Sequence, residues 1–123
     1  DEEWTALENY LIANGYNYDG TTTGNKIAKS LATSSGWLSS TYNGGVGNAD
    51  YPDKRNKTGF SALPGGIRYS GGSFQYVGEE GYWWSSSEHY QYSFFRHLIY
   101  NGSTVLRTYY GRHYGFSVRC LRD

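Results

Sequence analysis

The chain has little cysteine, no net charge and no long apolar run among its 123 residues. Its one cysteine, Cys120, excludes an internal disulfide and any metal site built from several thiolates. The 11 basic and 11 acidic residues cancel, so strong attraction to nucleic acid or to an anionic membrane is not expected. No run reaches the roughly 18 apolar residues of a membrane span, which predicts no direct membrane insertion. No signal peptide is present, and the start at Asp1 rather than Met predicts a piece trimmed from a longer exported protein.

The residue patterns that carry catalysis or bind cofactors are also missing. The sequence contains no G-x-S-x-G, P-loop or G-x-G-x-x-G motif. Its histidines, His89, His97 and His113, match no compact zinc spacing, and a site built from histidine alone stays a minor alternative. The stretch from Asn48 to Asp53 lacks EF-hand spacing, so turn formation explains it better than calcium binding. We therefore predict a protein that is not an enzyme and that uses no cofactor or metal.

Aromatic residues and glycine are abundant instead. Phe, Trp and Tyr make up 19% of the chain, with 14 tyrosines, and there are 17 glycines. A helical bundle would be rich in Leu, Ala, Glu and Lys, and a disordered chain would be poor in aromatics, so both are excluded. The composition predicts one compact domain over residues 1–123, dominated by short strands.

Hydrophobic spacing predicts two helices near the N-terminus, at about residues 2–14 and 25–32. Three acidic residues occupy the first turn of the first helix, where the helix dipole favours negative charge. Residues 34–59 are expected to form a long loop. Short strands are expected after it, at residues 60–63, 67–69, 73–77, 81–86, 92–100, 104–110 and 116–121. The result is an α+β fold with mainly antiparallel strands, and its core is expected to include Trp4, Leu7, Leu11, Trp37, Phe60, Phe116, Val118 and Cys120.

The hairpin joined around Asn101-Gly102 is the most informative element. An even-length turn places on one face Phe94, Arg96, Leu98, Tyr100, Val105, Arg107 and Tyr109. It places on the other face Phe95, His97, Ile99, Leu106, Thr108 and Tyr110. Neither face is polar, so if one packs on the core, the other exposes an apolar surface typical of a binding site. The alternative is that a helix or loop covers both faces.

Charge is unevenly distributed along the chain. Residues 89–122 contain no Asp or Glu, but they contain five arginines. This segment has the composition of an interaction surface. Pairing of its arginines with Glu79, Glu80, Glu88 or the acidic N-terminus explains the asymmetry equally well, and both interpretations stay open.

Several blocks occur in a recognisable order. They are Glu3-Trp4-Thr5-Ala6-Leu7-Glu8-Asn9-Tyr10-Leu11, Gly59-Phe60-Ser61-Ala62-Leu63-Pro64-Gly65-Gly66, Gly81-Tyr82-Trp83-Trp84-Ser85-Ser86-Ser87-Glu88 and Gly115-Phe116-Ser117-Val118-Arg119-Cys120. Together they resemble the Fibrobacter succinogenes major paralogous domain over essentially the whole chain. The resemblance implies a C-type-lectin-like fold from exported proteins of gut and rumen bacteria and their phages.

Some members of that family resemble the variable proteins of diversity-generating retroelements, in which adenine-directed mutagenesis rewrites a C-terminal repeat. Their constant frame corresponds here to Phe94, Arg96, Leu98, Tyr100, Val105, Arg107 and Gly115–Cys120. The interleaved variable positions correspond to Phe95, His97, Ile99, Leu106 and Thr108. The Glu-Pro-Asn and Trp-Asn-Asp signatures of calcium-dependent sugar-binding lectins are missing, so sugar specificity does not carry over.

We predict a non-catalytic ligand-binding module on a bacterial cell surface or phage particle, with a protein or glycan surface ligand and no nucleic acid. Its predicted centre is the face formed by Phe95, His97, Ile99, Leu106, Thr108 and Tyr110. Its predicted margins are Tyr90, Gln91, Asn101, Tyr109 and His113. As an exposed anchor, Phe95 should be replaceable by Ala without loss of stability, unlike Leu98. The alternative is a structural or adhesin repeat whose hairpin packs against a neighbouring domain.

Overall fold

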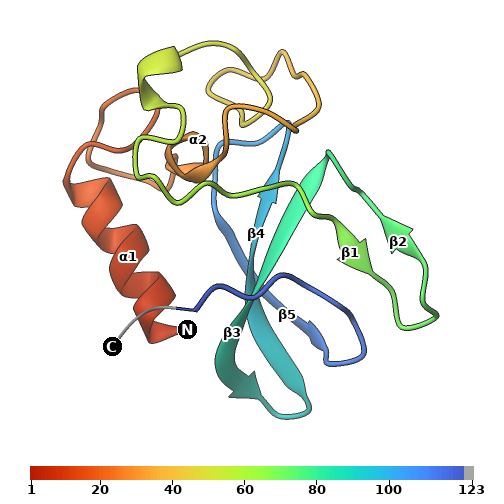
Figure 1. Cartoon of the computed structure of the whole chain (residues 1–123). Coiled ribbons are helices and arrows are strands. Elements are labelled where there is room, and N and C mark those ends of the chain that lie inside the picture. Colours follow the sequence, from red (N-terminus) through yellow and green to blue (C-terminus); the bar gives the residue numbers. More distant parts are fainter. Residues whose placement is uncertain (121–123) are drawn as a thin grey trace.

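The structure, a computed structural model, describes residues 1–120 and has the predicted α+β architecture (Figure 1). Its helical elements are α1 (Glu2–Ala13), α2 (Ala28–Leu31) and the 3-10 turn η1 (Pro52–Lys54). Its strands are β1 (Ile67–Arg68), β2 (Phe74–Gln75), β3 (Glu80–His89), β4 (Tyr92–Ile99) and β5 (Leu106–Gly111). Antiparallel pairing in both sheets agrees with the sequence-based expectation.

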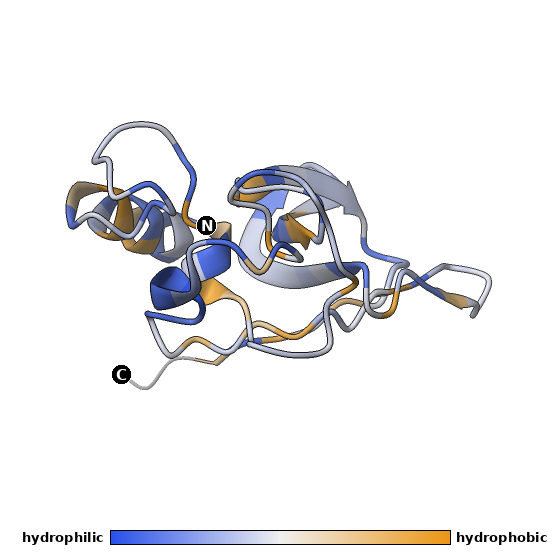
Figure 2. Ribbon diagram, turned by 90° about the horizontal axis from the view of Figure 1, so that it is seen from above, coloured by the Kyte–Doolittle hydropathy of each residue, from blue (hydrophilic) through white to orange (hydrophobic). Residues whose placement is uncertain are grey.

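The main sheet has the strand order β3-β4-β5, and β1 and β2 form a separate two-stranded hairpin. Helix α1 lies on one side of the main sheet and the β1–β2 hairpin on the other (Figures 1 and 2). We call these two sides the α1 face and the β1 face. Phe95 is opposite Thr108 and Arg96 is opposite Arg107, which confirms the parity predicted for the hairpin.

Helix α1 begins with Glu2 and Glu3 and ends at Ala13. The residue after it, Asn14, caps the helix with an N–H that donates to the carbonyl of Tyr10. Its residue Leu11 is buried in the main core, which lies between α1, α2 and the α1 face of the sheet. The other members of this core are Ile27, Ala28, Leu31, Ala32, Val46, Ala62, Trp83, Leu98 and Val105. Trp4, Leu7, Trp37 and Phe60 are half-buried and pack against it, so their contact with the core is as predicted although their burial is incomplete.

The long loop between α2 and β1 is organised by Lys29, whose side chain is fully buried. Its ammonium donates to the carbonyl of Asn48 at 2.8 Å and to the carbonyl and carboxylate of Asp50. Burial lowers the pKa of Lys29, while the Asp50 carboxylate opposes that shift. The predicted helix at residues 25–32 is shorter than expected, because the amide of Asn25 binds the backbone of Val105 instead of starting a helical turn.

Two predicted strands are wrong. Residues 60–63 contribute only an isolated bridge from Ala62 to Ala32. The segment predicted as a strand at 116–121 forms a single bridge, from Ser117 to Trp83, and its last residue lies outside the described part. In the described part of the chain no strand pairs with the residues after Ser117, so these residues have no core on either side, and both Val118 and Cys120 are exposed rather than buried.

Candidate functional site

The face predicted to bind a ligand is largely a second hydrophobic core. Phe95 is only 1% exposed and lies in a cluster with Ile67 and Tyr82. The centre of the Phe116 ring lies 4.7 Å from the centre of the Phe95 ring, because the chain after β5 turns back across the β1 face. The prediction that Phe95 is an exposed anchor is therefore wrong. A loop covers this face at Phe95, whereas the alternative expected a helix or loop over both faces.

The structure separates the other predicted residues into three places. Ile99, Asn101 and Leu106 lie beside Tyr42 around a shallow depression next to the loop that joins β4 to β5. Tyr110 is exposed on the β1 face, 5.5 Å from Tyr114, and His113 is exposed in the loop between them. The remaining residues of the predicted margin, Tyr90, Gln91 and Tyr109, lie near the β3–β4 turn, at the other end of the sheet from the depression. His97 and Thr108 are half-buried between these places.

His97 belongs to a polar cluster at the edge of the second core. Its Nε2 lies 2.9 Å from the Glu80 carboxylate, which also accepts a hydrogen bond from the Tyr82 hydroxyl. The His97 ring stacks on Tyr82 at 4.2 Å, with the ring planes only 10° apart. Burial lowers the pKa of His97, although Glu80 acts in the other direction, and burial together with Glu80 raises the pKa of Tyr82. The cluster holds β3 and β4 together and leaves little of His97 for a ligand.

An uncovered group of aromatic side chains lies on the α1 face at the turn between β3 and β4. We call it the aromatic tip, and its members are His89, Tyr90, Tyr92, Phe94 and Tyr109. Between ring centres, His89 lies 4.8 Å from Tyr109 and 4.9 Å from Tyr90, and Phe94 lies 5.6 Å from Tyr109. Tyr90 is 88% exposed and Tyr109 is 44% exposed. The family resemblance implied that Phe94 belongs to the constant frame, and neither His89 nor Tyr92 was among the predicted binding residues, although hairpin parity puts Phe94 and Tyr109 on one face.

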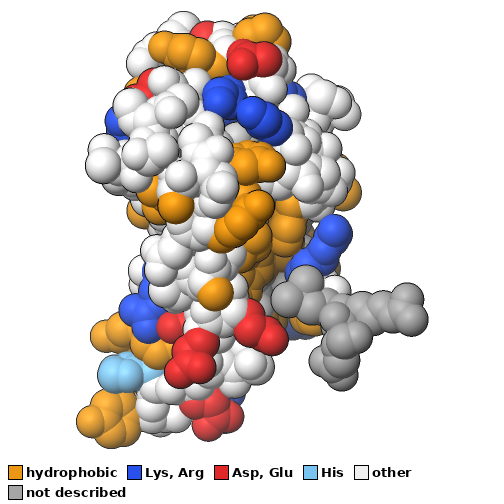
Figure 3. Space-filling view, turned by 90° about the vertical axis from the view of Figure 1, so that its left-hand side faces the viewer, with side chains coloured by type: hydrophobic (Ala, Val, Ile, Leu, Met, Phe, Trp, Pro, Cys, Tyr) orange, Lys and Arg blue, Asp and Glu red, His pale blue; other side chains and the backbone are white. Residues whose placement is uncertain are grey.

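Helix α1, which begins at Glu2, lies over the part of the α1 face next to the tip and not over the tip itself (Figure 1). Asp1, the residue before α1, binds Arg96 at 2.6 Å and Arg107 at 2.8 Å through its carboxylate. Its amino group donates to Ser87 at 3.0 Å. The hairpin projects beyond this point without helical cover (Figure 1). In Figure 3 hydrophobic and histidine side chains gather at this lower end of the molecule, beside basic and acidic ones.

The turn that ends the tip has a strained backbone. Tyr90 has φ +54°, a left-handed conformation that is unfavourable for a bulky residue. Its carbonyl accepts a hydrogen bond from Arg112, which also forms an ion pair with Glu88 at 3.0 Å. Such strain is found at functional sites when the surrounding structure holds it in place. Here it directs the most exposed large aromatic side chain of the described chain into solvent.

Comparison with protein families decides the classification. The sequence matches the Fibrobacter succinogenes major domain over residues 1–122. The chain belongs to this family. No curated protein and no solved structure matches it. The architecture of this Fibrobacter succinogenes major domain is α+β, and its C-type-lectin-like assignment stays a prediction.

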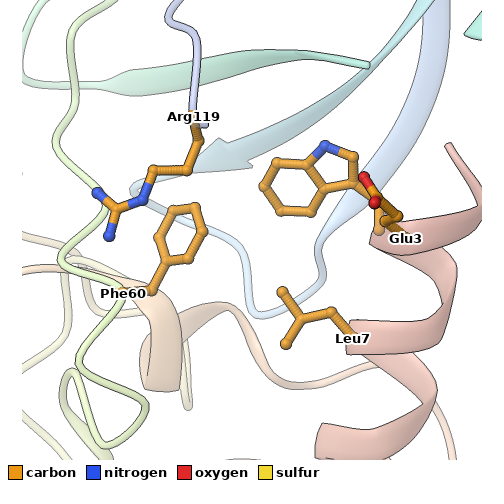
Figure 4. Close-up of a pocket in the computed structure, with 5 residues that line it drawn as sticks. Glu3, Leu7, Phe60 and Arg119 are labelled. Atoms are coloured by element: carbon orange, nitrogen blue, oxygen red, sulfur yellow. The ribbon is translucent and has the colours of Figure 1, made fainter. Parts of the chain in front are cut away.

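The same domain has an apolar cavity of about 180 Å³ between α1 and the C-terminal segment. Trp4, Leu7 and Phe60 form its walls, and Glu3 and Arg119 lie at its rim (Figure 4). The Arg119 guanidinium lies over the Phe60 ring at 4.7 Å. This volume is below the roughly 300 Å³ at which pockets for small molecules begin. The cavity is therefore a weaker candidate site than the tip.

Two further observations concern ions and membranes. Within residues 1–120, no three His, Cys, Asp or Glu side chains are grouped so that they could hold a metal ion. The Asp50 carboxylate already binds Lys29 and the Gly44 N–H, which is the turn chemistry expected for that loop. None of the helices described in this family member has the length and apolar character needed to cross a bilayer.

Proposed function

We propose that this chain is a non-catalytic binding module that recognises a protein or glycan surface ligand through the aromatic tip. The observation that carries the proposal is the uncovered end of the α1 face, where Tyr90, Tyr92 and Tyr109 are all exposed. The three exposed rings come from the β3–β4 turn, from β4 and from β5, and together they form a contiguous apolar surface. Such surfaces mark interaction sites.

The chemistry of the tip suits recognition of a macromolecule. Tyrosine offers a large contact area and a hydroxyl while losing little side-chain entropy, which is why antibody loops use it heavily. The β3–β4 pairing and the ion pairs of Asp1 fix the strands next to the tip, so binding would not have to order a flexible loop. A preorganised tyrosine surface supports affinity without a deep pocket.

We place the module on a bacterial cell surface or a phage particle, as the family resemblance implies, and assign it no enzymatic activity. Retroelement diversification belongs to the same proposal. It would alter Phe95 and His97 in the second core as well as exposed positions, so the tip and Tyr110 offer the more tolerant sites. Sequencing the encoding locus tests this: we expect a near-repeat of the codons for 89–122 beside a reverse transcriptase gene.

A second candidate function is a structural or adhesin repeat that packs against a neighbouring domain. It is favoured by exposed apolar side chains on and beside the β1–β2 hairpin. Phe74 is 70% exposed, Val77 67% and Leu63 61%. These residues lie on the β1 side of the molecule, away from the aromatic tip, so the two functions can be tested separately.

Binding experiments distinguish the two candidates. The purified chain is screened against a printed array of bacterial and plant glycans and a phage-displayed peptide library. We expect Tyr90→Ala and Tyr92→Ala to weaken binding to the selected ligands at least about tenfold. Tyr10→Ala is the matched control, because Tyr10 is 60% exposed on α1 and far from the tip in sequence. Ligands that respond to Phe74→Ala and not to the tip variants would instead support the repeat function.

A further inference from the structure

Strand β5 forms an exposed edge of the main sheet (Figure 1). Among residues 1–120 it pairs only with β4. It runs from Leu106 to Gly111 without proline or a bulge, and Arg107 is its only charged residue, so it has few of the devices that natural proteins use to protect an edge. An unprotected edge of this kind offers its free backbone groups to another strand.

The backbone groups that β5 directs outward can be identified. At the other edge of the sheet, Trp84 N–H donates to the Ser117 carbonyl and Ser117 N–H donates to the Tyr82 carbonyl. The backbone N–H and C=O groups of Tyr82 and Trp84 therefore point away from β4. Backbone direction alternates along a strand and is matched by the partner residue in each ladder. The backbone groups of Trp83 therefore point toward β4, and those of its partner Arg96 point toward β3. Because Arg96 points away from β5, the N–H and C=O groups of Arg107, its partner in β5, point outward, and those of Tyr109, two residues on, do the same.

The edge is closed at one end by a side chain. The Asn25 amide accepts a hydrogen bond from Val105 N–H at 3.1 Å and donates to the Val105 carbonyl at 3.2 Å. Asn25 therefore occupies the position of a neighbouring strand at Val105. In the described chain no protein group binds the outward N–H or C=O of Arg107 or Tyr109. The free edge thus begins just beyond Asn25.

We infer that two copies of this chain pair through β5, antiparallel and centred on Thr108. In this register Arg107 of one copy is opposite Tyr109 of the other, and these are the residues whose backbone groups point outward. Leu106 is opposite Tyr110, and Thr108 is opposite itself. Arginine beside an aromatic ring, leucine beside tyrosine and threonine beside threonine are all favourable cross-strand neighbours. Centring the pair on Arg107 instead would place like charges opposite each other.

The pairing joins the two three-stranded sheets into one. Side chains of directly opposed residues lie on the same side of an antiparallel pair, so the two α1 faces become continuous. The aromatic tips of the two copies then lie on the same surface, where a repeated ligand can engage both. The pairing does not depend on the proposed function, because its hydrogen bonds use backbone groups of β5; of the tip, only Tyr109 lies on this strand.

The test is the oligomeric state in solution, measured by sedimentation velocity over a range of concentrations. We expect the wild-type chain to form a species of about twice its 13.9 kDa mass. Thr108→Lys and Thr108→Glu each place like charges opposite each other, and each should weaken association on the order of tenfold or more. Mixing the two variants should restore the dimer, because the opposed residues then carry opposite charges. Thr41→Lys, in an exposed loop, is the matched control and should associate like wild type.

Three outcomes would overturn the inference. The first is a wild-type chain that stays monomeric at about 1 mM, the weak end of specific association. The second is a dimer that Thr108→Lys and Thr108→Glu leave as stable as wild type. The third is a pair of monomeric variants that fail to associate on mixing, although circular dichroism shows both folded. Loss of ligand binding by Tyr90→Ala in a chain that never dimerises would overturn the pairing while supporting the proposed function.

Discussion

Arg96 and Arg107 are opposite each other on the same face of the sheet, yet they lie in different environments. The Arg96 side chain is fully buried and binds Asp1, Glu8 and Thr5. The Arg107 side chain is 48% exposed and lies over the Phe94 ring at 4.0 Å. The boundary between the covered sheet and the aromatic tip thus passes between two paired arginines.

The difference shows what separates scaffold from surface in this domain. Both regions are built from alternating aromatic, aliphatic and basic residues, so composition does not distinguish them. Helix α1 supplies carboxylates and apolar side chains to the covered region, and no other element within residues 1–120 gives the tip comparable cover. A buried charge is tolerated only where its hydrogen bonds are satisfied. Asp1 binds both arginines, but Glu8 and Thr5 of α1 bind only Arg96.

The largest expected difference is between the neighbouring residues Phe95 and Phe94. Phe95→Ala should lower the free energy of unfolding by about 4 kcal/mol, because it leaves a cavity in the second core. Phe94→Ala should cost about 1 kcal/mol, because Phe94 lies in the half-open tip. Urea unfolding followed by tryptophan fluorescence measures both. Similar losses for the two variants would contradict the division into core and tip.

The two arginines provide the second comparison. Arg96→Ala should cost about 3 kcal/mol, because it leaves the carboxylates of Asp1 and Glu8 without their buried partner. Arg107→Ala should cost less than about 1 kcal/mol, as is usual for an exposed ion pair. The same urea titration reports both values. Equal losses would mean that cover by α1 does not set the environment of this face.

The pH dependence of stability tests the covered β1 face. Because burial holds the pKa of His97 below its usual 6.5, the unfolded state binds this proton more readily than the folded state. The free energy of unfolding should therefore fall as the pH drops below 6.5, by at most about 1.4 kcal/mol per pH unit. His97→Gln should reduce this slope. A slope that His97→Gln does not alter would contradict the buried, unprotonated state of His97.

The smallest effect is expected at the turn of the tip. Tyr90→Gly relieves a strain of about 1 kcal/mol but adds backbone freedom to the unfolded chain. The net result should be a gain of a few tenths of a kcal/mol in thermal unfolding, together with loss of ligand binding. A clear loss of stability would show that the Tyr90 ring supports the fold and is not only displayed by it.

Particular elements show how far sequence reasoning extends. The period of Trp4, Leu7 and Leu11 and the acidic first turn were enough to predict α1, because these signals are local. Hairpin parity was enough to predict which side chains share a face, because it depends only on turn length and register. The prediction of a strand at 116–121 was wrong, because alternating residues define two sides of a segment but do not show whether another strand pairs with that segment.

The site depended on contacts between distant residues. Parity put Phe95 and Tyr110 on one face. The segment that returns after β5 places Phe116 over Phe95 and buries it, whereas Tyr110 stays exposed. Hairpin parity also put Phe94 and Arg96 on one face. Only the contacts of Arg96 with Asp1 and Glu8, some 90 positions earlier in the sequence, showed that Arg96 is buried under α1. By itself the sequence determined the family, the α+β class and the two faces of the hairpin, since these follow from local period and motif. Only the tertiary structure decided which parts of those faces meet solvent, because burial depends on segments that lie far apart along the chain.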